Sequence, residues 1–151
     1  MRGERKVDNA ADSGIMESGG DNMRDTLEIA AERQKILDGT YPSRVTNAQR
    51  KHIEGTREFE QKRAAMPSGS EPSKLNPGIN AQELVDRYKG TGIIYFKPLN
   101  NKYPREDVIA DAIIGETWVK SLGRYVETRV FAIMYSGKGV HIIPMNGRGR
   151  M

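Results

Sequence analysis

The sequence contains no cysteine among its 151 residues, and it contains no long apolar run. The absence of cysteine excludes a disulfide framework, a zinc site with thiolate ligands and a thiol nucleophile. A membrane-spanning helix needs about 20 predominantly apolar residues, and residues 1–6 are charged with no apolar segment behind them. We therefore expect no membrane partner and no Sec-type export signal.

The motifs of several common enzyme classes are also missing. There is no phosphate-binding GxxxxGKS/T loop, no Rossmann glycine fingerprint, no HExxH and no GxSxG sequence. Nucleotide hydrolases and metalloproteases are therefore poor candidates. The charge is unbalanced, because 24 Lys and Arg against 20 Asp and Glu give a formal net charge of +4. This surplus favours a polyanionic partner, although soluble domains without one often show a similar value.

The N-terminal part of the sequence is predicted to lie outside the main domain. Residues 1–22 mix Gly, Ser, Asn and charged side chains with few large apolar ones, which indicates a disordered leader. A helix is expected from Asp25, because Glu28 completes a capping-box pattern, and Asp38-Gly39 should end it. The predicted divisions are a linker-like leader with one helix at residues 1–45, the main domain at 46–147 and a tail at 148–151.

The main domain is predicted to have the α+β class, with helices first and a four-stranded antiparallel sheet after them. Residues 47–65 fit either a short strand or a helix broken by Gly55, and the Pro- and Ser-rich residues 66–78 form a loop. Asn80 should cap the clearest helix, which Gly90 ends. Strands rich in β-branched and aromatic residues are expected at residues 92–96, 113–119, 125–135 and 140–145.

The last two predicted strands are joined by the segment Gly137-Lys138-Gly139. A three-residue loop of this kind forms a hairpin with glycine in the left-handed conformation. With that loop length, Tyr135 should lie opposite His141, and Ser136 should lie opposite Val140. One face of these strands must belong to the core, and the sequence leaves open which one.

The chain has two histidines, His52 and His141, and each has a hydroxyl-bearing residue nearby. Histidine is the side chain whose ordinary pKa suits proton transfer near neutral pH. Cleavage of RNA without a metal needs a base for the 2′-hydroxyl proton, an acid for the departing 5′-oxygen, and donors or cations for the charge that grows on the phosphate. Two histidines among arginine, lysine, serine and threonine supply that set, although a single histidine on a strand is more often structural or solvent-facing.

Blocks of this sequence resemble, in the same order, the blocks of the type 50 polymorphic toxin domain over residues 49–144. The matching segments are residues 49–56 (QRKHIEGT), 73–75 (SKL), 84–92 (LVDRYKGTG) and 135–144 (YSGKGVHIIP), with Glu106, Ile114-Gly115 and Glu127-Thr128 before the last block. The closing block is the most specific. The resemblance implies an RNase whose fold is similar to that of the barnase, EndoU, colicin and RelE nucleases, in which helices precede the four-stranded sheet that carries the site.

The residues and the resemblance together predict the members of the site. We expect His52 and His141 to exchange protons, assisted by phosphate-positioning hydroxyls and one reserve carboxylate base, namely Ser136, Thr128, Thr56 and Glu106. The expected substrate-binding residues are Lys138, Arg129, Tyr135, Lys51 and Ser73. The family often has lysine or another polar residue where this chain has Gly137, so Lys138 is expected to supply the cation. We expect no metal and no other cofactor.

The resemblance implies RNA as substrate and, for a toxin, a cognate immunity protein that covers the basic site by charge complementarity. Such a toxin acts in the cytoplasm of the producing cell or of a target cell. Similar domains also occur at the ends of phage head-morphogenesis proteins, so the alternative function is a non-catalytic module of a phage or mobile-element particle that binds nucleic acid or protein. A toxin that attacks DNA would need a metal site, for which the sequence offers no candidate.

Overall fold

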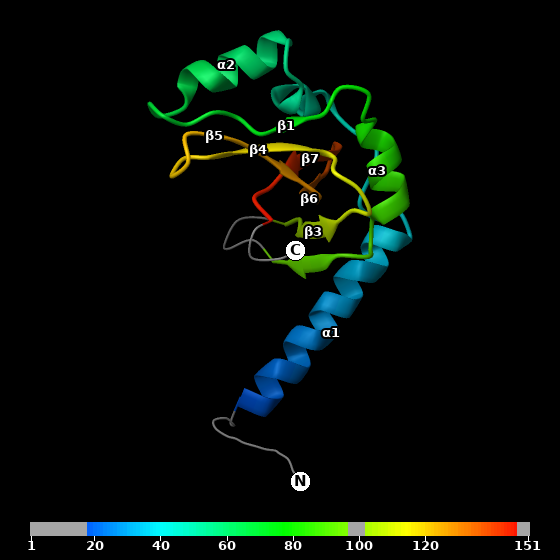
Figure 1. The fold of residues 1–151 in the computed structure, drawn as a ribbon. Coiled ribbons are helices and arrows are strands. Elements are labelled where there is room, and N and C mark those ends of the chain that lie inside the picture. The colour runs from blue at the N-terminus through cyan, green and yellow to red at the C-terminus, as the bar shows by residue number, and fades with distance from the viewer. Residues whose placement is uncertain (1–17, 97–101, 148–151) are drawn as a thin grey trace. The chain divides into compact units, whose positions relative to one another are not determined.

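The computed structural model of the chain describes residues 18–96 and 102–147 (Figure 1). The tail at 148–151 and most of the predicted leader therefore lie outside the described residues. The chain divides into two compact units, Met1–Gln34 and Lys35–Met151, and both β-sheets belong to the second. Among the described helices, none combines the length and the apolar character that crossing a membrane requires.

Helix α1 (Ser18–Leu37) begins before the predicted start at Asp25. A helix that has already formed extends at little cost per residue, so a capping pattern inside a continuous helix does not have to mark its beginning. The prediction of a disordered leader is therefore wrong for residues 18–22, which are helical. The predicted end is confirmed, because Asp38-Gly39 follow the helix and Gly39 has a φ of 83°.

Two antiparallel sheets follow in the second unit (Figure 1). The four-stranded sheet has the order β2-β3-β6-β7, and its strands are β2 (Ile93–Tyr95), β3 (Arg105–Ile109), β6 (Val130–Ser136) and β7 (Gly139–Pro144). The three-stranded sheet has the order β1-β4-β5, with β1 (Lys74–Leu75), β4 (Gly115–Val119) and β5 (Arg124–Thr128). The α+β class is confirmed, whereas the likeness to a particular nuclease fold stays a prediction.

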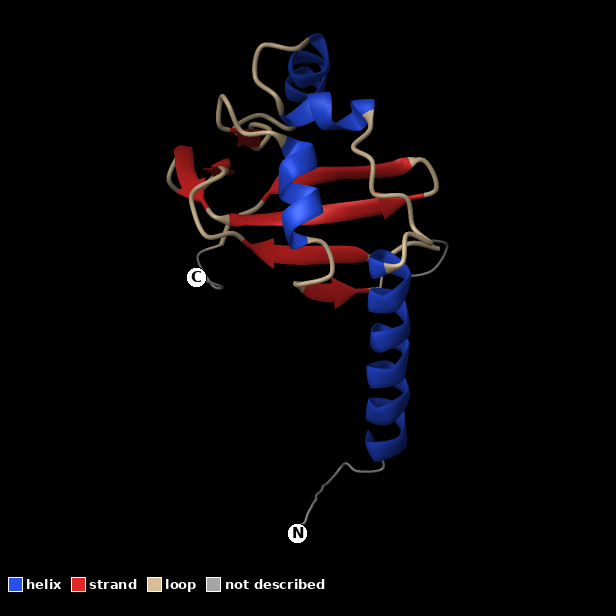
Figure 2. Cartoon of the chain, turned by 90° about the vertical axis from the view of Figure 1, so that its right-hand side faces the viewer, coloured by secondary structure: helices blue, strands red, loops and turns tan. Residues whose placement is uncertain are grey.

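Helix α3 (Ala81–Tyr88) lies across one face of the four-stranded sheet (Figure 2). Its predicted cap is confirmed, because the Asn80 side chain accepts a hydrogen bond from the Glu83 N–H. The ring of Tyr88 packs edge-on against Phe131, with the ring centroids 6.0 Å apart. Alternation along the paired strands places the buried apolar residues of this face together, namely Ile94, Val108, Phe131, Ile133, Val140 and Ile142.

Strand β3 was not predicted from the sequence, although it lies inside the four-stranded sheet. Its first three residues, Arg105, Glu106 and Asp107, are all charged, and charged runs normally indicate solvated segments. Here the charges are compensated within the fold. Arg105 donates to both carboxylate oxygens of Asp107 at 2.8 Å each, and Glu106 is fully buried among hydrogen-bond donors described below.

The single strand predicted at residues 125–135 is wrong, because this segment forms β5 and β6 in two different sheets. The change occurs after Thr128, whose hydroxyl donates to the Met145 carbonyl at 2.6 Å and accepts from the Val130 N–H at 3.0 Å. These bonds give the backbone an alternative to a continuous ladder. The chain can therefore leave one sheet for the other at this point.

The predicted register of the last hairpin is also wrong, by one residue. Ser136 pairs with Gly139, and Met134 rather than Tyr135 pairs with His141. The loop has two residues instead of three, because the Ser136 hydroxyl donates to the Gly139 carbonyl at 2.8 Å and accepts from the Lys138 N–H at 3.2 Å. A one-residue shift moves a side chain to the other face of a sheet. His141 therefore lies on the face opposite the α3-covered core.

Two short helices precede the sheets. The helical alternative for residues 47–65 is confirmed as a 3-10 helix, η1 (Asn47–His52), and helix α2 (Arg57–Ala65), separated at Gly55, which has a φ of 95°. The chain before η1 runs beside β7. The Val140 N–H donates to the Arg44 carbonyl, and the Val140 carbonyl accepts from the Thr46 N–H, both at 2.9 Å. This pairing starts η1 directly against the last strand.

Candidate functional site

A pocket of about 630 Å³ lies where the β6–β7 hairpin meets the beginning of η1. Its lining consists of Thr46, Asn47, Ala48, Tyr103, Met134, Tyr135, Ser136, Lys138 and His141. None of these nine described residues is acidic, and Lys138 contributes a cation. Four predicted site residues therefore share one pocket whose lining suits an anionic group such as a phosphate.

Gln49 determines where η1 lies on the sheet. Its side-chain amide donates to the Ile142 carbonyl at 2.9 Å and its side-chain oxygen accepts from the Ile142 N–H at 2.7 Å. The buried amide thus takes the place of a neighbouring strand beside β7. In a 3-10 helix, side chains three residues apart lie one above the other, so His52 follows Gln49 towards the same strand.

His52 is almost completely buried, with 3% of its surface exposed. Its Nδ1 lies 2.9 Å from the Ser73 carbonyl oxygen and 3.2 Å from the Ser73 hydroxyl. Because a carbonyl only accepts, Nδ1 carries the proton, and in the neutral ring Nε2 is left as an acceptor. Burial lowers the pKa of His52, the Ser73 carbonyl raises it, and the charges of Lys62 and Lys51 lower it further. The net direction is down, so the neutral ring is favoured.

The two histidines, 89 positions apart in the printed sequence, lie beside each other in the fold. Their rings are nearly parallel, at 8°, and the ring centroids are 6.3 Å apart. His141 is half-buried and lines the pocket, whereas His52 stands behind it against Ser73. The arrangement places a ring with an acceptor nitrogen next to a ring that faces the pocket.

Glu106 lies away from the histidines, on the core face of β3. One of its carboxyl oxygens accepts from the Gly90 N–H at 3.0 Å and from the Tyr135 hydroxyl at 2.7 Å, and the other accepts from the Gly92 N–H at 2.7 Å. Burial, followed by the charge and the hydrogen bond of Glu106, raises the pKa of Tyr135 far above its ordinary range. The three bonds tie the end of α3 to the sheet.

The remaining predicted residues lie outside the pocket lining. Thr56 caps α2 by accepting from the Phe59 N–H at 3.0 Å, and its hydroxyl lies 2.7 Å from the Arg50 carbonyl. Thr128 is fully buried at the crossing between the sheets. Arg129 lies at the opposite end of β6 from Met134, about 16 Å along the strand. Lys51 is exposed next to His52 and acts on it through its charge.

Neither Gln49 nor Tyr103 was predicted to belong to the site. Gln49 stands in the block that resembles the toxin family, but nothing in a sequence shows that an amide side chain will replace a strand. Tyr103 lies just before the unpredicted strand β3, so its position in the fold could not be anticipated. A Cβ atom on Gly137 would stand 2.9 Å from the Tyr103 hydroxyl, which explains why the hairpin has room for that ring.

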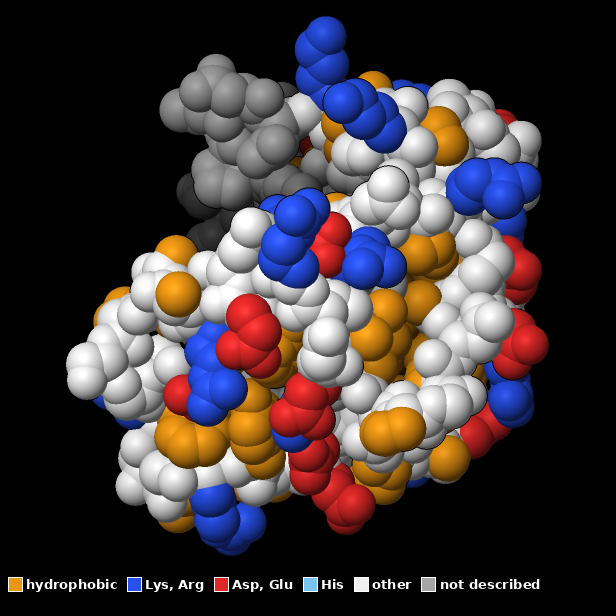
Figure 3. All heavy atoms as spheres, turned by 90° about the horizontal axis from the view of Figure 1, so that it is seen from above, with side chains coloured by type: hydrophobic (Ala, Val, Ile, Leu, Met, Phe, Trp, Pro, Cys, Tyr) orange, Lys and Arg blue, Asp and Glu red, His pale blue; other side chains and the backbone are white. Residues whose placement is uncertain are grey.

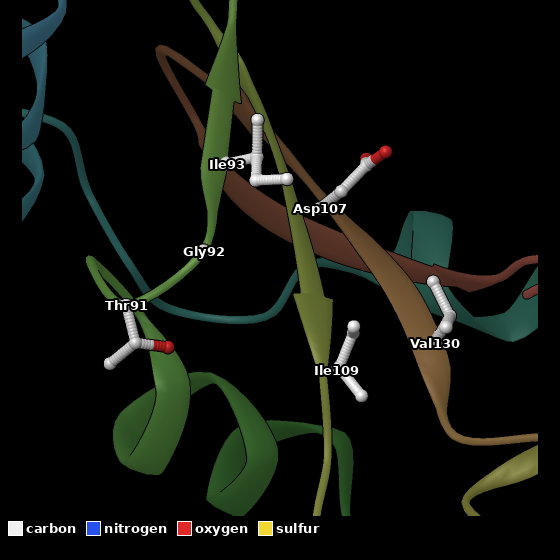
Figure 4. Close-up of a pocket in the computed structure, with 6 residues that line it drawn as sticks. All are labelled: Thr91, Gly92, Ile93, Asp107, Ile109 and Val130. Atoms are coloured by element: carbon white, nitrogen blue, oxygen red, sulfur yellow. The ribbon is translucent and has the colours of Figure 1, made fainter. Parts of the chain in front are cut away.

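A second pocket, of about 380 Å³, lies near the β2 edge of the four-stranded sheet (Figure 4). It is lined by Thr91, Gly92, Ile93, Asp107, Ile109 and Val130. Its titratable group among these described residues is Asp107, which Arg105 already holds by two hydrogen bonds. This pocket lacks a group suited to proton transfer at neutral pH, so the candidate site is the hairpin pocket.

The surface shown in Figure 3 carries Lys and Arg side chains beside Asp and Glu side chains, with apolar groups between them. Ion pairs also occur near α2, where Arg63 lies 2.7 Å from Glu71 and Arg50 lies 3.0 Å from Glu58. Paired charges attract a polyanion less than unpaired ones. The basic side chains of the described residues are therefore not gathered into one continuous basic surface on this side.

Within the described ranges, no cluster of three or more His, Cys, Asp or Glu side chains offers a metal site. No curated protein matches this chain. A family model does match, and it covers residues 45–144. This range includes η1, both sheets and every described residue that lines the hairpin pocket. The chain belongs to the bacterial toxin 50 family.

Proposed function

We propose that this toxin domain is a metal-independent ribonuclease, which transfers the phosphate of RNA to the adjacent 2′-hydroxyl. The observation that carries the proposal is the histidine pair. His141 faces a pocket that also contains Lys138 and Ser136, and His52 lies beside it with a ring centroid distance of 6.3 Å. One imidazole in an anion-compatible pocket and a second imidazole directly behind it supply an acid and a base without a metal.

The reaction assigns a different proton to each histidine. The 2′-oxygen forms a bond to phosphorus while the bond from phosphorus to the 5′-oxygen breaks. His52, whose neutral form is favoured, accepts the 2′-hydroxyl proton at Nε2. The imidazolium form of His141 donates its proton to the departing 5′-oxygen. The products are a 2′,3′-cyclic phosphate and a 5′-hydroxyl, and the two histidines have exchanged protonation states.

His52 is buried and lies outside the described pocket lining, so its contact with the ribose requires that the bound substrate opens a path to its ring. Catalytic contacts often tighten only in the substrate complex. Ser73 has a positioning role in this scheme, because its carbonyl keeps the Nδ1 proton in place and thereby keeps Nε2 available. Lys138 lies in the pocket lining, where its charge offsets the charge that grows on the phosphate.

The same scheme changes the roles of other predicted residues. Glu106 becomes a fold-supporting residue instead of a reserve base, because three donors already occupy its carboxyl group. Thr56 and Thr128 serve a helix cap and a strand crossing. Arg129 is too far along β6 to meet a phosphate beside His141.

The test incubates total tRNA and rRNA with wild-type protein, His141→Ala and Lys138→Ala in excess EDTA. Lys120→Ala is the matched control, because Lys120 is exposed and outside the pocket lining. Circular dichroism verifies equal folding. We expect wild type and Lys120→Ala to cut, His141→Ala to lose cutting, and Lys138→Ala to be slower. Binding without cutting by every protein would overturn the proposal in favour of a non-catalytic particle module.

A toxin of this kind also implies a protein partner. The pocket combines Lys138 and His141 without an acidic residue among its described lining. We propose that an acidic immunity protein covers it, because charge complementarity gives such inhibitors their fast association. Weaker binding of the candidate inhibitor to Lys138→Glu than to wild type, measured by calorimetry, would support this partner, and unchanged binding would contradict it.

A further inference from the structure

We infer that Tyr103 is a further substrate-contacting residue of this site, and that its hydroxyl donates a hydrogen bond to a non-bridging oxygen of the scissile phosphate. This inference rests on the proposed ribonuclease function. It is carried by the position of Tyr103 in the pocket that holds His141 and Lys138, and by the closeness of its hydroxyl to Gly137, where an added Cβ atom would stand 2.9 Å from the hydroxyl oxygen.

The strand register places Tyr103 and His141 on opposite sides of β6. Arg105 pairs with Met134, and the Tyr135 N–H donates to the Pro104 carbonyl at 3.4 Å, so the chain before β3 continues alongside β6. Tyr103 therefore lies beside the end of β6 on the β3 side. His141 lies on the β7 side, where it pairs with Met134.

The distance between these two positions suits a phosphodiester. Two strand spacings separate the backbones of β3 and β7, which amounts to roughly 10 Å. Both side chains line the same pocket, whose volume of about 630 Å³ admits a phosphate group that accepts a hydrogen bond of about 2.8 Å from each of them. A phosphate above the end of β6 can therefore reach Tyr103 and His141 at once, with Lys138 on the hairpin between them.

The ring of Tyr103 is held in place while its hydroxyl stays available. The buried ring of Tyr41 packs edge-on against it, with ring centroids 5.4 Å apart. No hydrogen bond joins the Tyr103 hydroxyl to any residue that the structure describes. Its nearest constraint is Gly137, where an added Cβ would stand 2.9 Å from the hydroxyl oxygen. A fixed donor that has no described partner and faces an anion-compatible pocket is preorganised for a ligand oxygen.

The closeness of the Tyr103 hydroxyl to residue 137 also accounts for the glycine at that position of the hairpin. Lys138 and Ser136 flank the glycine, and both line the pocket. A side chain at 137 would require the Tyr103 hydroxyl to shift, because its Cβ atom would stand 2.9 Å from that oxygen. In this chain the aromatic hydroxyl therefore occupies space that a side chain on the hairpin would otherwise take.

The first experiment compares steady-state cleavage of an RNA oligonucleotide by wild type, Tyr103→Phe and Tyr95→Phe. Tyr95→Phe removes the same atom from an exposed ring outside the pocket lining. We expect kcat to fall roughly 10- to 100-fold in Tyr103→Phe with a smaller change in KM, because a hydrogen bond to a charged group is lost. Tyr95→Phe should match wild type, and the midpoint of urea unfolding should not move in Tyr103→Phe.

The second experiment is a double-mutant cycle between Tyr103→Phe and Gly137→Ala. In the wild-type background the new methyl group meets the hydroxyl at 2.9 Å, so Gly137→Ala should also lower kcat. In the Tyr103→Phe background the nearest ring atom is Cζ at 3.6 Å, an ordinary contact, so Gly137→Ala should cause no further loss. Such non-additivity indicates that both changes act on the same hydroxyl.

The outcomes separate this inference from the function on which it rests. If wild-type protein does not cut RNA, the proposed function is overturned, and the role of Tyr103 is overturned with it. If wild type cuts and Tyr103→Phe cuts equally fast, only the role of Tyr103 is overturned. Additive losses in the double-mutant cycle would also contradict the inference, because Gly137→Ala would then act through the hairpin itself.

Discussion

At the scale of single residues, the fold controls the protonation of His52. Burial lowers the pKa of His52 and the Ser73 carbonyl partly opposes that effect. The native protein therefore takes up a second proton on the His52 ring less readily than the unfolded chain does. A group of this kind favours folding above its unfolded pKa and loses that contribution as the pH falls.

We expect the free energy of unfolding of the wild type to decrease as the pH falls from 7.5 to 5, because the unfolded state takes up a proton at His52 that the native state resists. His52→Gln should show a weaker decrease, since an amide can still donate to the Ser73 carbonyl but does not titrate. Urea unfolding at several pH values measures both slopes. His141→Gln is the control that keeps His52, and equal slopes in wild type and His52→Gln would contradict the expectation.

Glu106 provides a second test at the residue scale. Glu106→Gln puts a donor amide where three buried donors require an acceptor, so the free energy of unfolding should fall by about 2–3 kcal/mol. The kcat of the folded fraction should stay close to wild type. Glu127→Gln, at an exposed position, is the control. Unchanged stability with lost turnover would restore Glu106 as a catalytic base.

At the scale of secondary-structure elements, the site depends on how η1 and the segment before it lie against β7. Gln49 binds both backbone groups of Ile142, and residues 44–46 run beside Val140. The approach is close at Gly139, where a Cβ would stand 2.2 Å from the Arg44 carbonyl oxygen and the φ of 139° already favours glycine. Only glycine fits there without moving the backbone.

We expect Gly139→Ala to lower the free energy of unfolding by about 3 kcal/mol or more, because backbone must move to admit the methyl group. Gly123→Ala is the matched control, since Gly123 also has a positive φ, of 65°, but a Cβ there meets nothing within 4 Å. Gly123→Ala should lower the free energy of unfolding by roughly 1 kcal/mol. Urea unfolding measures both, and equal losses would mean that the contact with Arg44 is unimportant.

The elements that could be predicted from the sequence are those with local signals. Helix α3 has its cap at Asn80 and its stop at Gly90, and both follow from neighbouring residues. Strand β3 could not be predicted, because its buried Glu106 is compensated by Gly90, Gly92 and Tyr135, which are distant in sequence. The hairpin was located correctly, but its register depended on one side-chain bond from Ser136 to Gly139.

At the scale of the whole molecule, the site is assembled from segments that only the tertiary fold brings together. The pocket takes residues from the start of η1, from the approach to β3 and from the β6–β7 hairpin. His52, Ser73 and His141 were predicted from the sequence, and His52 lies against each of the other two. Tyr103 could not be predicted, because its position depends on β3 lying next to β6.

The identity of the reaction products tests the central claim most directly. A short RNA is incubated with wild-type protein or His141→Ala in excess EDTA, and the ends of the fragments are identified by mass spectrometry. A ribonuclease that uses the 2′-hydroxyl should leave 2′,3′-cyclic phosphate and 5′-hydroxyl ends with wild type, and no fragments with His141→Ala. Fragments with 5′-phosphate ends, cutting that survives in His141→Ala, or no cutting by the folded wild type would contradict the account.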